Sequence, residues 1–382
     1  MDGYSFQSVK TTLVQSGAVL QLSELLAERG LTRPLFVTDA QLIELGVVSP
    51  AIEALRQGAD DVIVFDGIEP DPSERVVYAC LDAFKAGSCD SVIAVGGGSS
   101  MDVAKVVSVL AKGKQDLPEI YGVGMVSGGR LPLFLAPTTA GTGSEVTPVA
   151  IITTGETTKA GVSSPILLPD VAILDASLTL GLPASISAMT GIDAMVHAIE
   201  AYTSKIKKNP ISDMLALRAL KLLSENIRKV LVSPGDVAAR EAMLLGSMFA
   251  GQAFANAPVG AVHALAYPVG GHYHIPHGLS NSLMLPAVLA FNAEACPELY
   301  AELARVIPGA DQSAEGLIDW FKALIDESGL PATLAQANIP ESDLPMLAKD
   351  AMFQQRLLIN NPREVDEATA LRLYEEAWSG WA

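Results

Sequence analysis

The sequence predicts two domains of unlike class: residues 1–182 form an α/β domain with a parallel sheet, and residues 183–382 form an all-helical domain. Short β-rich runs alternate with helical patterns up to about Pro183, which is typical of a parallel sheet with helices packed on it. Beyond that point the β pattern stops and amphipathic stretches follow one another. A chain of 382 residues is long enough for two or three domains. Two such domains predict a cleft between them, where ligands commonly bind.

Six strands are expected in the first domain, each apolar on both faces as buried parallel strands are. They are residues 35–38, 61–65, 91–95, 131–136, 150–154 and 171–174, and helical patterns alternate with them at 18–29, 73–86 and 100–111. The amphipathic stretches of the second domain are 187–204, 210–231, 237–255, 261–269, 296–306, 314–327 and 367–378. Residues 275–278 are expected to form a turn that carries His277.

The charge of the chain restricts its partners. Its formal net charge of −18 repels phosphate backbones and anionic membranes, so we expect neither nucleic acid nor membrane as a partner. Charged residues make up 18% of the chain against roughly 25% in an average domain, which predicts a large core and an oligomer interface. The N-terminus lacks a signal-peptide pattern and the three cysteines are widely spaced, so a cytoplasmic location is expected.

A glycine-rich turn follows the strand predicted at 91–95. Gly96, Gly97 and Gly98 allow the backbone to approach a ligand closely, and the next helix offers free N–H groups with partial positive charge. Ser99 adds a hydroxyl or caps that helix. The turn therefore predicts a phosphate or pyrophosphate site, although neither the G-x-G-x-x-G fingerprint nor the P-loop is present. The alternative is a tight turn without a ligand.

Two further features point to a nucleotide cofactor. Residues 137–147, PTTAGTGSEVT, follow another predicted strand and supply many small donors that suit a ribose, a diphosphate or a nicotinamide amide. Asp39 follows the strand at 35–38, where a carboxylate accepts hydrogen bonds from ribose hydroxyls and repels a 2′-phosphate, which favours NAD over NADP. The alternatives are an ordinary polar loop and an aspartate that caps the next helix.

The histidines are concentrated in the second domain, at His197, His263, His272, His274 and His277. This clustering favours a metal site because neutral imidazole is the commonest metal ligand. Asp193 lies four residues before His197 on one face of an apolar helix, where both side chains would be buried and need a partner. A divalent metal bound by these two residues and two later histidines would supply it; a surface Asp–His pair is the alternative. Such a ligand set suits Fe²⁺, Zn²⁺, Co²⁺ or Ni²⁺.

The chain resembles the iron-containing (group III) alcohol dehydrogenases over essentially its full length. The motifs that carry the resemblance occur in one order: GGGSSMDVAK (96–105), PTTAGTGSEVT (137–147), GIDAMVHAIEAYTS (191–204), HIPHGLSNSLMLP (274–286) and NPR (361–363). The resemblance implies the dehydroquinate synthase-like fold of that family, with an N-terminal dinucleotide domain and a helical domain that binds a metal. It also implies a homodimer.

The same resemblance assigns roles to single residues. It places the metal, Fe²⁺ first and Zn²⁺ as the alternative, on Asp193, His197, His263 and His277. It places NAD on Gly97, Gly98 and Ser99 with Asp102 nearby, on Thr138, Thr139 and Thr142 beside the nicotinamide, and on Lys159 at a ribose. Phe254 would border the substrate.

One position departs from the family pattern. Many relatives carry a histidine four residues after the third metal ligand, where this chain has Tyr267. This chain therefore lacks that histidine for a proton route. Tyr267 would contact the substrate or relay a proton through water, or would pack against the metal site; His272 or His274 are alternatives for the relay.

The function expected is a metal-dependent NAD(H) alcohol dehydrogenase that interconverts small alcohols and aldehydes or ketones. The metal would polarise the substrate oxygen, and hydride transfer is the chemistry of the cofactor. The alternatives are a hydroxyacid–oxoacid transhydrogenase, a maleylacetate-reductase-like enzyme, a dehydroquinate-synthase-like lyase and a non-catalytic nucleotide sensor. The lyase is disfavoured because only Lys205 lies near the motifs at 193–204 and 261–281, where a phosphorylated acid would need a basic pocket.

Overall fold

The computed structural model describes residues 3–155 and 158–380. The chain divides into two compact units. One unit is Gln7–Gly181, and the other is Leu182–Ala382 together with the residues up to Phe6.

The first unit is built on a six-stranded sheet in which every pairing is parallel, as predicted. Its strand order is β1-β9-β6-β4-β2-β3. The strands are β1 (Thr11–Val14), β2 (Pro34–Val37), β3 (Ile63–Phe65), β4 (Ser91–Gly96), β6 (Leu133–Pro137) and β9 (Val171–Leu174). The central strands β2, β4 and β6 are buried along their whole length, which explains why their sequences are apolar on both faces.

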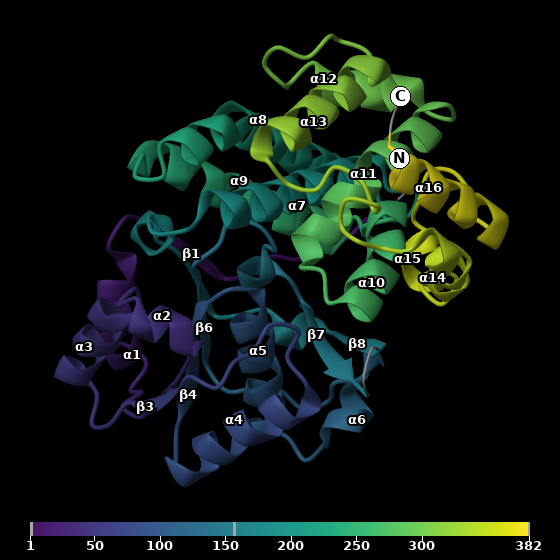
Figure 1. Cartoon of the computed structure of the whole chain (residues 1–382). Coiled ribbons are helices and arrows are strands. Elements are labelled where there is room, and N and C mark those ends of the chain that lie inside the picture. The colour runs from purple at the N-terminus through teal and green to yellow at the C-terminus, as the bar shows by residue number, and fades with distance from the viewer. Residues whose placement is uncertain (1–2, 156–157, 381–382) are drawn as a thin grey trace. The chain divides into compact units, whose positions relative to one another are not determined.

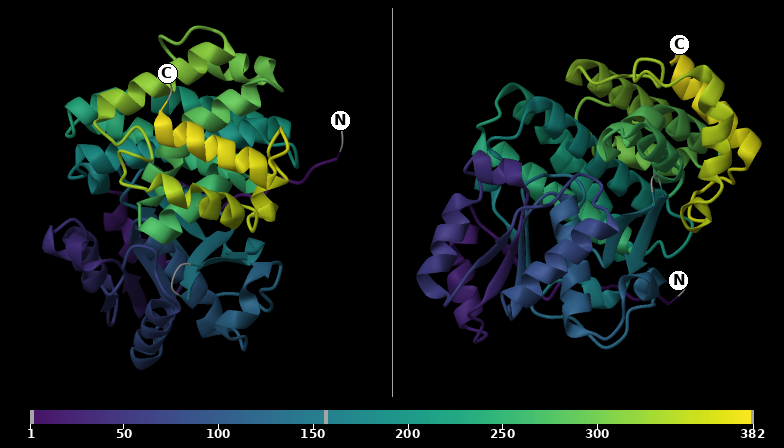
Figure 2. Two further views of the ribbon diagram at one scale, coloured as in Figure 1. Left: turned by 45° about the vertical axis from the view of Figure 1, so that its right-hand side comes forward. Right: turned by 60° about the horizontal axis from the view of Figure 1, so that its bottom comes forward.

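Helices cover both faces of this sheet. Alternate residues of β2, β4 and β6 pack against α4 (Glu74–Ala86) and α5 (Gly98–Lys112), and the intervening residues pack against α1 (Leu22–Ala27) and α3 (Ser49–Gly58). Figures 1 and 2 show the strands between these two groups of helices. The shorter elements of the unit are α2 (Ala40–Glu44), α6 (Leu117–Ile120) and the 3₁₀ turns Ala18–Gln21, Ser144–Val146, Pro165–Leu167 and Ala176–Thr179.

The prediction that residues 150–154 belong to the parallel sheet is wrong. The strand β7 (Val149–Thr154) pairs antiparallel with β8 (Thr158–Ser163), and β5 (Gly122–Val123) completes a separate three-stranded sheet. Only alternate residues of β7 are buried: Ala150 and Ile152 are covered, and Ile151 between them is partly exposed. The strand therefore has one covered face, although its sequence is apolar on both. The helix predicted at 18–29 is also shorter than expected, because it begins as a 3₁₀ turn and becomes α-helical at Leu22.

The described residues of the second unit form helices and the segments that connect them, without a strand. Its helices are α7 (Ala184–Thr203), α8 (Pro210–Val232), α9 (Val237–Asn256), α10 (Ala261–Tyr273), α11 (His277–Ala293), α12 (Pro297–Ala304), α13 (Ala314–Ser328), α14 (Leu344–Ala351), α15 (Gln355–Leu358) and α16 (Glu367–Ser379), with a 3₁₀ turn at Glu341–Asp343. Helix α7 packs closely against α8 and α9. The approach is close at Gly191, where a Cβ would lie only 2.5 Å from the Ile227 side chain of α8. Among the described residues, none of these helices combines the length and the apolar character needed to cross a bilayer.

His277 does not lie in a turn, as the sequence was expected to place it, but begins helix α11. The turn is shorter and ends at Pro276, whose φ of −52° and ψ of 139° lead into the first helical residue. Helix α10 likewise continues past the predicted end at Val269 and through Pro268, to Tyr273. His274 then adopts a left-handed conformation, with φ 53°, that ends α10.

Candidate metal and cofactor sites

Helix α7 carries the first two candidate metal ligands. Asp193 and His197 are one helical turn apart, and both side chains are buried among the Ala, Met, Val and Ile residues of the same helix. That apolar helix takes two polar side chains out of water, which is unfavourable unless each finds a partner.

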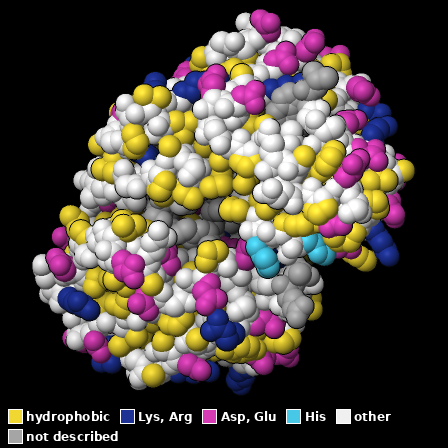
Figure 3. Space-filling view, in the orientation of Figure 1, with side chains coloured by type: hydrophobic (Ala, Val, Ile, Leu, Met, Phe, Trp, Pro, Cys, Tyr) yellow, Lys and Arg dark blue, Asp and Glu magenta, His cyan; other side chains and the backbone are white. Residues whose placement is uncertain are grey.

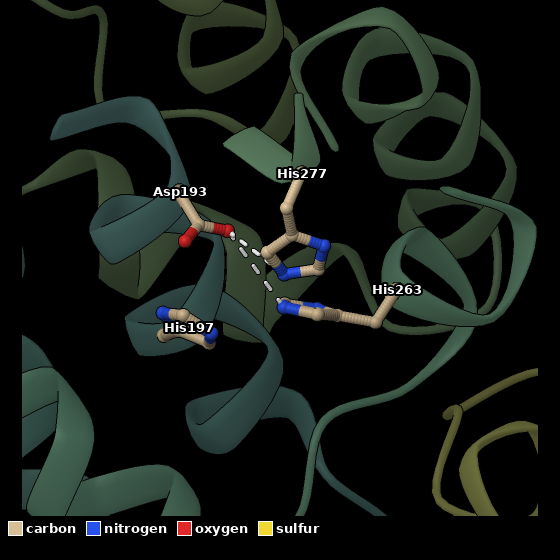
Figure 4. A group of neighbouring side chains, drawn as sticks. All are labelled: Asp193, His197, His263 and His277. Atoms are coloured by element: carbon tan, nitrogen blue, oxygen red, sulfur yellow. Dashed lines mark ion pairs between the residues drawn. The ribbon is translucent and has the colours of Figure 1, made fainter. Parts of the chain in front are cut away.

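Two other helices bring the remaining candidates to the same place. His263 lies in the first turn of α10 and His277 is the first residue of α11. One ligand atom from each of the four residues lies within 4.8 Å of the other three. The Nε2 atoms of His263 and His277 lie 3.9 and 3.6 Å from Asp193 Oδ1, as Figure 4 shows.

The electrostatics of this group fit a cation. Burial works against the charged form of Asp193, but the three histidines and a hydrogen bond from Asn281 hold its pKa below the ordinary value. The Asn281 amide donates to Asp193 Oδ1 at 2.6 Å, and its Nδ2 lies 3.2 and 3.3 Å from the Nε2 atoms of His263 and His277. Three imidazole nitrogens and one carboxylate oxygen are the donor set of Fe²⁺ or Zn²⁺ sites. The residues therefore suit a divalent transition metal.

Glu200 is a buried residue of this site that sequence reasoning did not single out. Its Oε2 lies 2.6 Å from His263 Nδ1, and its Oε1 accepts a hydrogen bond from the backbone N–H of Val262 at 2.7 Å. The signal was present in the sequence, because Glu200 follows His197 by three residues on the same face of the helix.

Aromatic rings border the metal ligands. Phe254 of α9 stacks on His197 with ring centroids 4.3 Å apart, and Tyr267 of α10 lies tilted against His277 at 5.9 Å. His263 stacks on His197 at 4.7 Å. Phe254 was expected to border the substrate, and Tyr267 to contact it or relay a proton. The two rings pack on different candidate ligands. Of the alternatives for the relay, His272 pairs with Asp350 at 2.6 Å.

The candidate cofactor loops follow neighbouring strands of the main sheet. The turn after β4 passes through Gly97, which is extended, into α5 at Gly98. The loop after β6 is joined to it where Thr138 N–H donates to the Gly96 carbonyl at 3.0 Å. A Cβ at Gly98 would meet the Thr142 side chain at 2.9 Å, whereas a Cβ at Gly97 would meet nothing within 4 Å. Gly97 therefore leaves an open space beside the free N–H groups of α5, which fits a phosphate.

Asp102 has an internal role in this region. Its carboxylate accepts hydrogen bonds from Ser144 Oγ at 2.6 Å and from the Ile151 N–H at 2.9 Å, so it joins α5 to the second loop and to β7. Lys105, which is completely buried, donates to Ser144 Oγ and to the Val149 carbonyl, both at 2.7 Å. Burial lowers the pKa of Lys105 to about 8 and raises that of the neighbouring Glu145 to about 7.

Two of the remaining candidates in the first unit, Asp39 and Lys159, have protein partners. Asp39 caps α2, because its side chain accepts a hydrogen bond from Leu42 N–H at 2.9 Å. Lys159 on β8 pairs with Asp71 at 2.5 Å. Ser99, Thr139 and Thr142 are half-buried.

Comparison with known proteins identifies the family. The profile of "Iron-containing alcohol dehydrogenase" matches residues 10–176, and that of "Fe-containing alcohol dehydrogenase family, C-terminal" matches residues 187–378. Long-chain-alcohol dehydrogenase 1 of Geobacillus thermodenitrificans is 38% identical over 95% of this chain and 94% of its own. The crystal structure of a 1,3-propanediol oxidoreductase superimposes with a TM-score of 0.94 at 34% identity, over 99% of this chain and 100% of its own.

A third similar protein was solved with its cofactor. The sulfoacetaldehyde reductase of Bifidobacterium kashiwanohense, in complex with NAD⁺, is 29% identical with a TM-score of 0.89, over 99% of this chain and 100% of its own. The chain therefore belongs to the iron-containing alcohol dehydrogenase family, which confirms the predicted resemblance and fold class. Its relatives are alcohol dehydrogenases and aldehyde reductases, and the chain is an oxidoreductase of this kind.

Proposed function

We propose that the chain interconverts small alcohols and aldehydes or ketones with NAD(H), using one divalent metal ion. The observation that carries the proposal is the convergence of Asp193, His197, His263 and His277 within 4.8 Å, with the first three side chains buried and His277 partly exposed. The relatives described above, which act on long-chain alcohols, 1,3-propanediol and sulfoacetaldehyde by their names, support an alcohol or aldehyde substrate.

The four residues would hold the metal, Fe²⁺ by the family and Zn²⁺ as the alternative. A metal bound by them supplies Lewis acidity toward a substrate oxygen and favours its deprotonated form. The stacked rings of His197 and Phe254 provide an apolar wall beside the ligands, and Phe254 would keep water from the carbinol carbon. Tyr267 is one turn of α10 from His263, and we propose that its hydroxyl passes the substrate proton to water.

The cofactor would be NAD rather than NADP. Gly97, Gly98 and Ser99 would take the diphosphate at the start of α5, and Asp102 supports that turn through its bonds to Ser144 and Ile151. Thr138, Thr139 and Thr142 would line the nicotinamide, while Asp39 and Lys159 would reach ribose hydroxyls. A carboxylate at Asp39 disfavours a 2′-phosphate.

We extend the proposal to the organisation of the protein. Residues 1–182 would form the cofactor domain and residues 183–382 the metal and catalytic domain. The protein would act in the cytoplasm as a homodimer or larger homo-oligomer. Figure 3 shows acidic and basic side chains scattered among apolar and uncharged ones on one face. The net charge of −18 does not favour nucleic acid or anionic membranes as partners.

The test is metal analysis of the purified protein, paired with NADH formation from a panel of short alcohols and diols before and after chelation. We expect one metal per chain, loss of activity on chelation and recovery with Fe²⁺ or Zn²⁺. Activity that survives complete metal removal would overturn the metal-dependent mechanism and favour the maleylacetate-reductase-like branch.

A further inference from the structure

Glu200 uses both carboxylate oxygens on two consecutive residues of another helix. Oε1 accepts the N–H of Val262 at 2.7 Å, and Oε2 lies 2.6 Å from Nδ1 of His263. The side chain of Glu200 is only 5% exposed, so neither contact is shared with bulk water. Helix α10 begins after Gly260, which has no side chain to cap it, and Glu200 of α7 therefore takes the capping role from outside the helix.

The contact determines which ring nitrogen of His263 carries the proton. A carboxylate only accepts hydrogen bonds, so Nδ1 must donate to it. The lone pair of the neutral ring is then on Nε2, the atom that faces Asp193 at 3.9 Å. If the proton were on Nε2 instead, the ring could not offer that nitrogen to a metal.

We propose that Glu200 is a positioning residue of the metal centre, which fixes the tautomer and ring orientation of His263. The inference rests on the metal site of the proposed function. A carboxylate on the outer nitrogen of a histidine ligand orients the ring and raises its basicity. Glu200 also supplies charge: together with Asp193 it balances a divalent cation in a buried site, whereas Asp193 alone leaves one positive charge uncompensated.

The substitution Glu200→Gln tests this arrangement with almost no change in shape. Glutamine offers one acceptor oxygen where the carboxylate offers two, so its NH₂ group must face either Val262 N–H or His263 Nδ1. In the second case the proton of His263 moves to Nε2 and competes with the metal. We expect the dissociation constant for Zn²⁺, measured by competition with a chromophoric chelator, to rise about 10- to 100-fold.

Glu200→Asp distinguishes positioning from packing. Aspartate is one methylene shorter and packs less well, but it keeps two acceptor oxygens and the negative charge. We expect it to bind Zn²⁺ more tightly than Glu200→Gln, whereas a packing role predicts the reverse order. Glu294→Gln is the matched control, because it removes an exposed carboxylate that pairs with Arg363 at 2.7 Å, and its Zn²⁺ affinity should equal that of the native protein.

The tautomer can be read directly. Because the chain has five histidines, ¹⁵N-histidine labelling gives a spectrum simple enough to assign with the His263→Ala variant. We expect the proton of His263 on Nδ1 in the native protein, with and without Zn²⁺, and a shift toward Nε2 in metal-free Glu200→Gln. Native Zn²⁺ affinity in Glu200→Gln, or a proton on Nε2 of native His263, would overturn the proposal. If the native protein bound no metal, the proposed metal site would fall, while a proton on Nδ1 of His263 would still support its orientation by Glu200.

Discussion

The two ring nitrogens of His263 face different groups. Nδ1 faces the carboxylate of Glu200, and Nε2 faces the candidate metal ligand Asp193. We predict that His263→Ala lowers NADH formation more than about a hundredfold, since a ligand contributes at least as much as an outer partner does. The buried Oε2 of Glu200 also loses its donor, which should cost about 1–3 kcal/mol of stability. Metal content, turnover and the free energy of unfolding check this. Wild-type turnover with His263 absent would remove it from the metal centre.

Glu145 makes a separate prediction about pH. Burial raises its pKa to about 7 from an unfolded value of 4.5, so the folded protein holds a proton that the unfolded chain has released between these values. Its contribution to stability is therefore complete below about pH 4.5 and is lost as the pH rises through 7. A shift of this size corresponds to about 3 kcal/mol.

We expect Glu145→Gln to gain stability relative to the native protein as the pH rises from 5 to 8. Urea unfolding of both proteins across this range gives the difference, from which the titration of groups that do not interact with Glu145 cancels. A difference that is independent of pH would mean that Glu145 is ionised in the folded protein throughout. Lys105 does not interfere at the acidic end, because its pKa of about 8 keeps it protonated there.

At the scale of an element, the turn into α5 contains two adjacent glycines, Gly97 and Gly98, whose surroundings differ. A Cβ at Gly97 would meet no neighbour, and the φ of −74° at this residue suits alanine. We predict that Gly97→Ala leaves the free energy of unfolding within about 0.5 kcal/mol of the native value. NADH binding should nonetheless weaken at least tenfold, because the methyl group would occupy the space proposed for the diphosphate.

Gly98→Ala is the comparison variant. Its methyl group would lie 2.9 Å from Thr142, so we expect it to lower stability by about 1–3 kcal/mol as well as NADH affinity. Fluorescence titration with NADH and chemical unfolding separate the two effects. Unchanged NADH affinity in Gly97→Ala would place the diphosphate elsewhere.

The central strands of the main sheet were predictable from sequence, and so was the edge strand β3 within 61–65, whereas the edge strand β1 was not. Strands β4 and β6 have apolar residues in succession because both faces are covered. Strand β1 lies at the edge of the sheet, its residues Thr11 and Val14 are exposed, and its sequence lacks that pattern. Helix α11 was not predicted because its sequence contains Pro286, although the helix continues through this residue. In addition, His277 stands between a proline and a glycine, a combination that is typical of turns.

Spacing along the chain predicts the candidate site only where one helix carries the pattern, whereas His263 and His277 were assigned by the family resemblance. The four-residue spacing of Asp193 and His197 places them on one face without further information. Which later histidines join them depends on where α10 ends and α11 begins. The structure brings His263 and His277 to Asp193, while His274 ends α10 in a left-handed conformation. Glu200 and Asn281 act through contacts between helices, which spacing along the chain does not reveal.

At the scale of the whole molecule, the two candidate sites lie on separate compact units. We predict that chelation lowers the thermal unfolding temperature while the dissociation constant for NADH stays within about threefold of its holoprotein value. Excess free metal at a hundred times its dissociation constant should restore about 2.7 kcal/mol. Calorimetry with and without Zn²⁺, and NADH titration of the metal-free protein, check this. Complete loss of NADH binding on chelation would instead mean that the metal is needed to fold the cofactor site.

The ligands of the candidate metal centre are far apart along the chain, from Asp193 on α7 to His277 at the start of α11. An ion bound by all four ligands would tie α7 to α10 and α11 in the folded protein and act there as a reversible cross-link between distant parts of the chain. Heat inactivation would then start with release of the ion, and its rate would fall as the concentration of free metal rises.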